Sequence, residues 1–268
     1  DLPGQKGTAG NSTFPPLSVP ALAVPVQLPS GVKAAALVAV TQAPAVTQAP
    51  AKKGPIVVTP DAKGMIDTTP FKKDPPYTLC FSNASVANDW RVAMKGHVDY
   101  AIEQAKAKGL IKDYFYTDAN NDPNKQISDI EDLLTKGCDV LLISAAAQDV
   151  VDPGAKQAME SGVPVITVDR DVQSPANRVS YTDGDSCLMG TKQAEWLAKT
   201  LNGKGSIVLL SGIAGASPAE ERLRCARAVF AKYPDIKELA QAYTDWSTTG
   251  GQKQMEAWIT QFGDKING

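Results

Sequence analysis

Side chains able to bind a small polar molecule gather after several short apolar stretches that are predicted to be strands. They combine amides, carboxylates, guanidinium groups and indole rings, and the candidates are Asn83, Asn88, Asp89, Trp90, Asp169, Arg170, Arg222 and Trp246. For Arg222, which lies one turn inside a predicted helix, the pattern alone does not decide between ligand contact and a structural role. In open α/β sheets, ligands bind beyond the carboxyl ends of the strands. Asp, Asn and Arg can each form two hydrogen bonds to hydroxyl groups, and Trp can cover the apolar face of a sugar ring. This set therefore predicts a site for a neutral polyhydroxylated ligand.

Some of these residues have a structural alternative. Asn88 or Asp89 could cap the first predicted helix as readily as it could bind a ligand. Asp122, which precedes a proline, is expected to be a helix cap. A purely structural role is harder to assign to the pair Asp169-Arg170. Two charges at a buried strand end are costly unless they pair with other charges or bind a ligand. We therefore favour ligand contact for that pair.

Enzyme signatures are mostly missing. His97 is the only histidine, and because it lies on the apolar face of a predicted helix we expect it in the core. No Ser-His-Asp or Cys-His arrangement is plausible with that one histidine. The glycines of Gly212–Gly215 match neither of the two glycine-rich patterns of nucleotide-binding sites, G-x-x-x-x-G-K-[ST] and G-x-G-x-x-G. Carboxylates are plentiful, so a hydrolase that uses carboxylates alone stays open, but we expect a protein that is not an enzyme and has no cofactor or metal.

The elements that position these candidates alternate regularly from Tyr77 onward. Short apolar runs predict strands, and 3.6-residue apolar periods between them predict helices. The predicted strands are Tyr77–Ser82, Tyr114–Asp118, Asp139–Ser144, Val163–Val168 and Arg178–Thr182 in a first series, and Ser206–Ser211 and Glu238–Tyr243 in a second. Strict alternation implies parallel sheets covered on both faces. We therefore predict the α/β class with doubly wound parallel sheets.

Composition narrows the function further. A net charge of −2 and a pI near 5.5 offer no attraction to nucleic acid or to anionic membranes. No apolar stretch reaches the roughly 18 residues of a transmembrane helix. The sequence opens at Asp1, with no initiator Met, as it would after removal of a secretory signal or after any other trimming of the chain.

The four cysteines are widely spaced and form no C-x-x-C motif, which argues against zinc or a thioredoxin-like site. We expect Cys80, Cys138, Cys187 and Cys225 all to be small buried apolar residues. A disulfide between Cys187 and Cys225 is the alternative, and spacing alone does not decide it.

Residues 1–76 differ sharply from the rest. They hold 13 of the 19 prolines and carry a net charge of +3, and the pentapeptide Val-Thr-Gln-Ala-Pro occurs at Val40–Pro44 and again at Val46–Pro50. Frequent prolines remove backbone donors and favour extended segments. We predict a Pro/Ala-rich extension or linker, with residues 1–70 lying on the surface or detached. A partner-binding arm is the alternative.

In order and spacing, several motifs resemble the ribose-binding-like branch of the periplasmic substrate-binding proteins that feed ABC transporters. The resemblance covers Tyr77 to Gly268. It rests on the loop that ends in Asn88-Asp-Trp90, the segments Asp118–Gln126 and Val163–Arg170, Thr182-Asp-Gly-Asp185 with Gly190, and Ser211–Arg222.

The resemblance implies a type I fold of two α/β lobes with a crossover near Thr182 and Asp183. The expected domains are the extension 1–76, a first lobe 77–182 and a second lobe 183–268. Family chains continue with further strands, so we expect the second lobe to be incomplete at its C-terminus. Asp169 and Arg170 would bond sugar hydroxyls; Arg222, Trp90 and Trp246 would also contact the ligand. Either Asn83 or Asn88 would take a further polar role.

The function implied is a monomeric, periplasmic solute-binding component of an ABC-type sugar importer, with a membrane permease as its partner and no chemistry performed. One rival is a receptor that senses a ligand for a chemosensor or signalling kinase. Another is the effector domain of a lac-repressor-type regulator. That rival needs an N-terminal helix-turn-helix, and residues 1–76 show no helical period.

Overall fold

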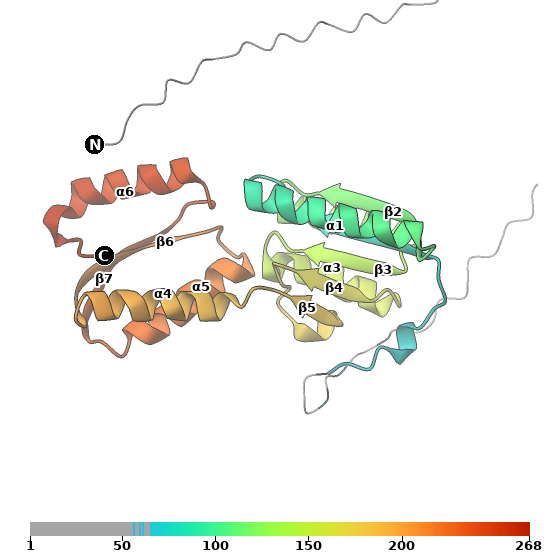
Figure 1. The fold of residues 1–268 in the computed structure, drawn as a ribbon, viewed down its shortest axis with the longest axis horizontal. Coiled ribbons are helices and arrows are strands. Elements are labelled where there is room, and N and C mark those ends of the chain that lie inside the picture. Colours follow the sequence, from blue (N-terminus) through green and yellow to red (C-terminus); the bar gives the residue numbers. More distant parts are fainter. Residues whose placement is uncertain (1–55, 57–58, 60, 62–64) are drawn as a thin grey trace, which may run out of the picture. The chain divides into compact units, whose positions relative to one another are not determined.

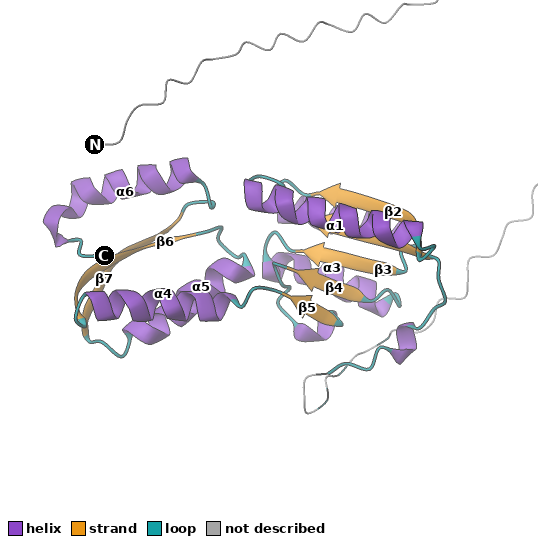
Figure 2. Cartoon of the chain, in the orientation of Figure 1, coloured by secondary structure: helices purple, strands orange, loops and turns teal. Residues whose placement is uncertain are grey.

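Two separate parallel sheets are formed in the part of the chain that the computed structural model describes, which is residues 56, 59, 61 and 65–268 (Figures 1 and 2). The larger sheet has the order β2-β1-β3-β4-β5, and the smaller pairs β6 with β7. The strands are β1 Tyr77–Asn83, β2 Ile111–Asp118, β3 Val140–Ser144, β4 Val165–Val168, β5 Ser180–Thr182, β6 Lys204–Ser211 and β7 Asp235–Tyr243. Every pairing is parallel, which confirms the predicted α/β class.

A helix follows nearly every strand, as the alternation predicts. The helices are α1 Asp89–Ala107, α2 Pro123–Thr135, α3 Gln148–Glu160, α4 Ser186–Thr200, α5 Ser217–Phe230 and α6 Thr248–Phe262. The exception is the step from β4 to β5, which contains only the 3₁₀ turn Pro175–Asn177. We call residues 77–182 the five-stranded half and residues 183–268 the two-stranded half.

The main core lies on the side of the larger sheet that faces α2 and α3. Cys80, Leu141 and Val165 project from adjacent strands and are fully buried there. Ile130 and Leu133 of α2 pack against them, together with the small apolar residues of α3. Because side chains alternate along a strand, each strand presents one such row to these helices. The cluster holds the carboxyl ends of β1, β3 and β4 at fixed positions beside one another.

Two helix starts are set by side-chain caps. Asp122 accepts hydrogen bonds from the backbone N–H groups of Asn124 and Lys125, which confirms its predicted capping role. Asn88 accepts from the N–H of Arg91 and so caps α1, while Asp89 is the first residue of that helix. The structure therefore decides between the two capping candidates in favour of Asn88.

Helix α1 is rotated away from the orientation that its sequence predicts. His97 is exposed, so the expectation that it lies in the core is wrong. The buried residues of α1 are Arg91 and Ile102, which are eleven positions apart and share one helical face. The inward face thus begins with a charged residue. Arg91 and His97 are six positions apart, so their side chains point about 120° apart around the helix.

The two-stranded half places helices on both sides of its sheet. In Figure 1, α4 and α5 lie on one side of β6 and β7, and α6 lies on the other. Helices α4 and α5 approach very closely at Gly190, where an added Cβ would lie 2.2 Å from the carbonyl oxygen of Arg222. Only glycine permits this approach. It fixes α4 against the helix that carries Arg222.

The halves are joined by more than the crossover at Thr182. The N–H of Gln148 donates to the carbonyl of Gly215 at 2.9 Å, and the N–H of Asp171 donates to Ser217 Oγ at 2.7 Å. These bonds connect the first residue of α3 and the turn after β4 to the segment that begins α5. They set the orientation of the two-stranded half in this structure.

All four cysteines are paired, which corrects the expectation that they are unpaired core residues. Cys80–Cys138 joins β1 to the turn before β3, and Cys187–Cys225 joins α4 to α5, with Cα atoms 5.8 Å and 5.3 Å apart. The alternative pairing of Cys187 with Cys225 is therefore confirmed. Cys80 and Cys138 lie 58 residues apart in sequence, and only the pairing of β1 with β3 brings them together.

Part of the segment before β1 packs on the five-stranded half. Ile56, Ile66 and Phe71 lie against its main core, and Lys73 pairs with Asp139 at the start of β3. The repeated pentapeptides and most of the prolines lie outside the described residues. The boundary at residue 76 therefore stays a prediction. Within the described residues, no helix is long and apolar enough to cross a membrane.

We predict that removing one disulfide lowers stability measurably. Replacing both Cys187 and Cys225 with Ala opens a cross-link between residues 38 apart in sequence, and should lower the free energy of unfolding by about 2–4 kcal/mol, because the unfolded chain gains freedom. Urea titration measures this change. Alkylation of the native wild-type protein, followed by mass spectrometry, should find no free thiol; four modified cysteines would contradict the pairing.

Candidate functional site

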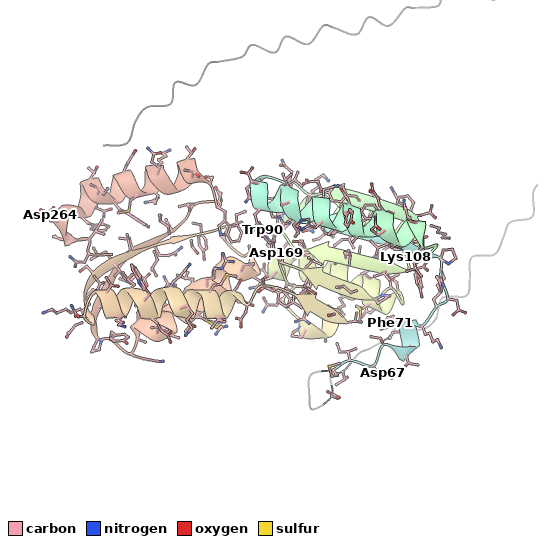
Figure 3. All side chains as sticks on the ribbon, in the orientation of Figure 1. Asp67, Phe71, Trp90, Lys108, Asp169 and Asp264 are labelled. Carbon is pink, nitrogen blue, oxygen red and sulfur yellow. A yellow bond between two sulfur atoms is a disulfide. The ribbon has the colours of Figure 1, made fainter. Side chains whose placement is uncertain are left out.

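A cavity of about 550 Å³ lies where the carboxyl ends of the large sheet meet the two-stranded half. Its lining residues are Asn88, Asp89, Trp90, Arg91, Asp169, Arg170, Asp183, Gly184, Met189, Pro218, Arg222 and Trp246. Seven of the eight residues singled out from sequence are among them. Figure 3 shows Trp90 and Asp169 together at this end of the five-stranded half, whereas Lys108 lies at the far end of α1.

Asp169 and Arg170 enter the cavity from a strained turn after β4. Asp169 adopts a left-handed backbone conformation with φ of 64°, which costs free energy in a residue other than glycine. Two backbone bonds hold it there: its N–H donates to the carbonyl of Thr182 at 2.8 Å, and the N–H of Arg170 donates to that of Val168 at 2.7 Å. The turn therefore points both charged side chains into the same space.

Arg91 is the central site residue that the sequence analysis missed. Its side chain is almost completely buried, with 2% of the residue exposed. Nη1 donates to Asp169 Oδ2 at 2.5 Å and to Ser144 Oγ at 2.9 Å, and Nε donates to the carbonyl of Ser85 at 3.1 Å. A signal was present in the sequence, because Arg91 lies on the same helical face as Ile102.

Asn83 is the predicted site residue that does not line the cavity. It is fully buried, its Oδ1 accepts from Arg91 Nη2 at 2.5 Å, and its Nδ2 donates to the carbonyl of Ser85 and to Tyr116 Oη. Its amide is therefore occupied by protein groups. In this structure Asn83 helps to position Arg91, and a ligand contact for Asn83 stays a prediction.

Arg170 and Arg222 each have one side-chain N–H group that donates no hydrogen bond among the described residues. The Nε atoms of both are buried and have no hydrogen-bond partner among the described residues. Arg170 is 1% exposed, and its Nη1 donates to Asn121 Oδ1 at 3.2 Å. A buried N–H without an acceptor costs roughly 1–3 kcal/mol. These two donors therefore favour a bound molecule that offers acceptor oxygens.

The charges around the cavity balance. Three arginines (Arg91, Arg170, Arg222) and three aspartates (Asp89, Asp169, Asp183) line it. Burial lowers the pKa of Arg170 to about 10, with the nearby positive charge of Arg91 acting in the same direction, so Arg170 stays charged at neutral pH. Burial raises the pKa of the Asp169 carboxyl, and the two arginines oppose that rise. Since the formal charges cancel, a neutral ligand suits the site better than an ion.

Two tryptophans supply the apolar surface of the site. Trp246 follows β7 in a left-handed conformation with φ of 50°, and the Arg170 guanidinium lies 5.0 Å from its ring centre. The indole rests directly on Gly212, where an added Cβ would lie 2.1 Å from Trp246 Cε2. Trp90, at the start of α1, is 57% exposed. Each indole has a guanidinium group beside it, Arg91 near Trp90 and Arg170 near Trp246, and this combination can bond hydroxyls and cover C–H faces.

Comparison with known proteins assigns the chain to a family. Residues 79–268 match the family described as "Periplasmic binding protein domain", and the chain belongs to that family. This agrees with the resemblance found in the sequence. Membership of a family of binding proteins also agrees with the expectation that the protein is not an enzyme.

Individual relatives are similar over part of their length. The xylitol-binding protein of Mycolicibacterium smegmatis is 31% identical over 164 residues, which cover 61% of this chain and 46% of that protein. The ribose import binding protein of Haemophilus influenzae is 32% identical over 145 residues, which cover 54% of this chain and 48% of that protein. The chain thus spans about half the length of these curated relatives.

A solved structure extends the comparison to the fold. The fructose-binding periplasmic domain of a hybrid two-component system has 29% identity and a TM-score of 0.64, covering 71% of this chain and 61% of that domain. The parallel sheets of this chain are therefore those of a type I periplasmic binding protein.

We predict that Gly212→Ala displaces the indole of Trp246, because the new methyl group would overlap the ring. The near-ultraviolet circular dichroism should change, and affinity for a bound polyol should fall by about tenfold or more through lost ring contact. Gly251→Ala is the matched control, since a Cβ there meets nothing within 4 Å. Equal spectra and equal affinity for the two variants would contradict the close packing at Gly212.

We also predict that Arg91→Met destabilises the fold by about 3 kcal/mol, because it leaves the Asp169 carboxylate buried without its partner. In this variant the pKa of Asp169 rises further above its unfolded value, so stability should fall as pH rises through that range. Urea titrations between pH 4 and pH 8 measure this. Adding Asp169→Asn should recover part of the loss; strictly additive losses would contradict the pairing.

Proposed function

We propose that this protein captures a small neutral sugar or polyol in the cavity between its halves and performs no chemistry on it. The observation that carries the proposal is the charge-balanced lining of three arginines and three aspartates beside two tryptophans. Charged groups that pair with one another can still bond hydroxyls, and no net charge is left to demand an ionic ligand.

The proposed ligand contacts come from both halves. Asp169, Arg170 and Arg91 would bond hydroxyls from the five-stranded half, and Arg222 would do so from the other. The Nε atoms of Arg170 and Arg222, which have no hydrogen-bond partner among the described residues, fit hydroxyl oxygens as acceptors. Trp90 and Trp246 would cover C–H faces of the ligand. Asn88 and Asp89 also line the cavity, and Asn88 caps α1 as well.

A ligand held from both sides favours closure of the halves around it, with hinge motion at the crossover near Thr182. The names of the similar proteins, which bind xylitol, ribose and fructose, support the ligand class. We propose that the protein is the solute-binding component of an ABC-type importer, works as a monomer in the periplasm and delivers its ligand to a membrane permease. Two disulfides suit that oxidising compartment.

A sensory receptor is the second candidate, because one similar solved domain belongs to a hybrid two-component system. Both functions use the same ligand site and differ in the partner. Ligand uptake by cells that lack the protein separates them: lost uptake supports transport, whereas normal uptake with a lost transcriptional response supports signalling.

We predict that calorimetry on the full chain will detect binding of at least one of xylitol, D-ribose and D-fructose. Asp169→Ala should weaken that binding by about 1.5–3 kcal/mol, as expected for a hydrogen bond to a charged group. Trp246→Ala should weaken it through lost ring contact. Asp264→Ala is the control, because Asp264 lies on the surface far from the cavity (Figure 3).

Two outcomes would contradict this proposal in different ways. If none of xylitol, D-ribose and D-fructose binds at millimolar concentration, the proposed ligand class is wrong. If one binds but Asp169→Ala and Asp264→Ala bind it equally well, the ligand lies elsewhere.

A further inference from the structure

One side chain of the cavity has no role in the contacts described so far. Met189, in the first turns of α4, lines the cavity and is 40% exposed. A large apolar side chain left open to water in a mostly charged pocket forgoes the free energy that burial would provide. Trp90, also widely exposed, lines the same cavity from the five-stranded half. The cavity therefore has an unburied apolar side chain on each side.

The position of Met189 is tied to the crossover between the halves. Its Cε lies 3.1 Å from where a Cβ on Gly184 would be, so the methyl group rests against the bare backbone of that glycine. Gly184 itself lines the cavity and lies two residues after the end of β5. The thioether thus sits where the two halves would move relative to each other.

Helix packing couples Met189 to the predicted ligand residues of its own half. Gly190 follows it directly and touches the backbone of Arg222, and the disulfide Cys187–Cys225 joins the same two helices. Helices α4 and α5 therefore move as one body. A closure that moves α5 and Arg222 therefore moves Met189 as well, and Trp90 lines the same cavity from the five-stranded half.

We propose that Met189 and Trp90 form an apolar gate that closes over the bound ligand and sets how long it stays. The inference rests on the proposed function and adds a residue to its site. A flexible, polarisable thioether adapts to C–H edges of different shape. When the gate shuts, it excludes water from the hydrogen bonds of Arg91, Asp169 and Arg170, which strengthens them. The gate should act mainly on the rate of ligand release.

The chain offers a matched control beside Met189. Leu188 precedes it on the same turn and is 50% exposed, but it does not line the cavity. Leu188→Ala and Met189→Ala thus remove exposed apolar side chains of similar size from neighbouring positions. Met189→Leu keeps the apolar volume and tests whether the contact, and not the sulfur, is needed.

The test is stopped-flow and calorimetric binding of the tightest of xylitol, D-ribose and D-fructose to the full chain. Met189→Ala should weaken affinity by about five- to tenfold, the effect of losing about 1–1.4 kcal/mol of apolar burial, and nearly all of it should appear as faster release. Met189→Leu should stay within about twofold of the wild type, and Leu188→Ala should be unchanged. Far-ultraviolet circular dichroism and thermal unfolding check that the variants are folded.

The possible outcomes distinguish failure of the gate from failure of the proposed function. If the wild type binds but Met189→Ala behaves like Leu188→Ala, the gate is overturned and the proposed function stands. If affinity falls through slower association alone, the gate is also overturned. If the wild type binds none of xylitol, D-ribose and D-fructose, the proposed function fails and the gate fails with it.

Discussion

The buried ion pair between Arg91 and Asp169 is the interaction on which the site depends. It joins the first turn of α1 to the turn after β4, two elements that are far apart in sequence and whose charges would each be costly to bury alone. Asn83 and Ser144 add further acceptors for Arg91 from the ends of β1 and β3. The pair thereby aligns the carboxyl ends of three neighbouring strands, and it leaves Asp169 facing the cavity together with Arg170.

Backbone strain is concentrated where this alignment is used. Asp169 and Trp246 both adopt left-handed conformations at strand ends, one in each half. Such conformations persist only when their surroundings hold them, and here backbone bonds hold Asp169 while Gly212 accommodates the ring of Trp246. The result is a charged residue and an indole that converge on one cavity from opposite halves. Arg170 spans the space between them, with its guanidinium near the indole and its Nε close to Asp169.

Each half has strong internal links, and hydrogen bonds and the crossover join the two halves. One disulfide lies in each half, and Gly190 locks α4 onto α5. Between the halves there are the crossover and hydrogen bonds from Gln148 and Asp171 to the start of α5. Rigid bodies joined by few bonds are the usual design of hinge proteins. This division places Met189 and Trp90 on different halves, between which we propose the hinge motion.

The sequence by itself determined the alternation of strands and helices and the cap at Asp122. It also placed Asp169 and Arg170 in the cavity, because residues after parallel strands meet at one edge of a sheet, whereas the role of Arg222 followed from the family resemblance. Only the tertiary structure decided which charges pair. Arg91, the supporting role of Asn83, the exposure of His97 and the Cys80–Cys138 disulfide all depend on how α1 is rotated and on which strands are neighbours. Periodicity reports which face of an element is apolar. It does not report how much of that face other elements cover, or which distant polar groups meet there, because those contacts form only when the chain is folded.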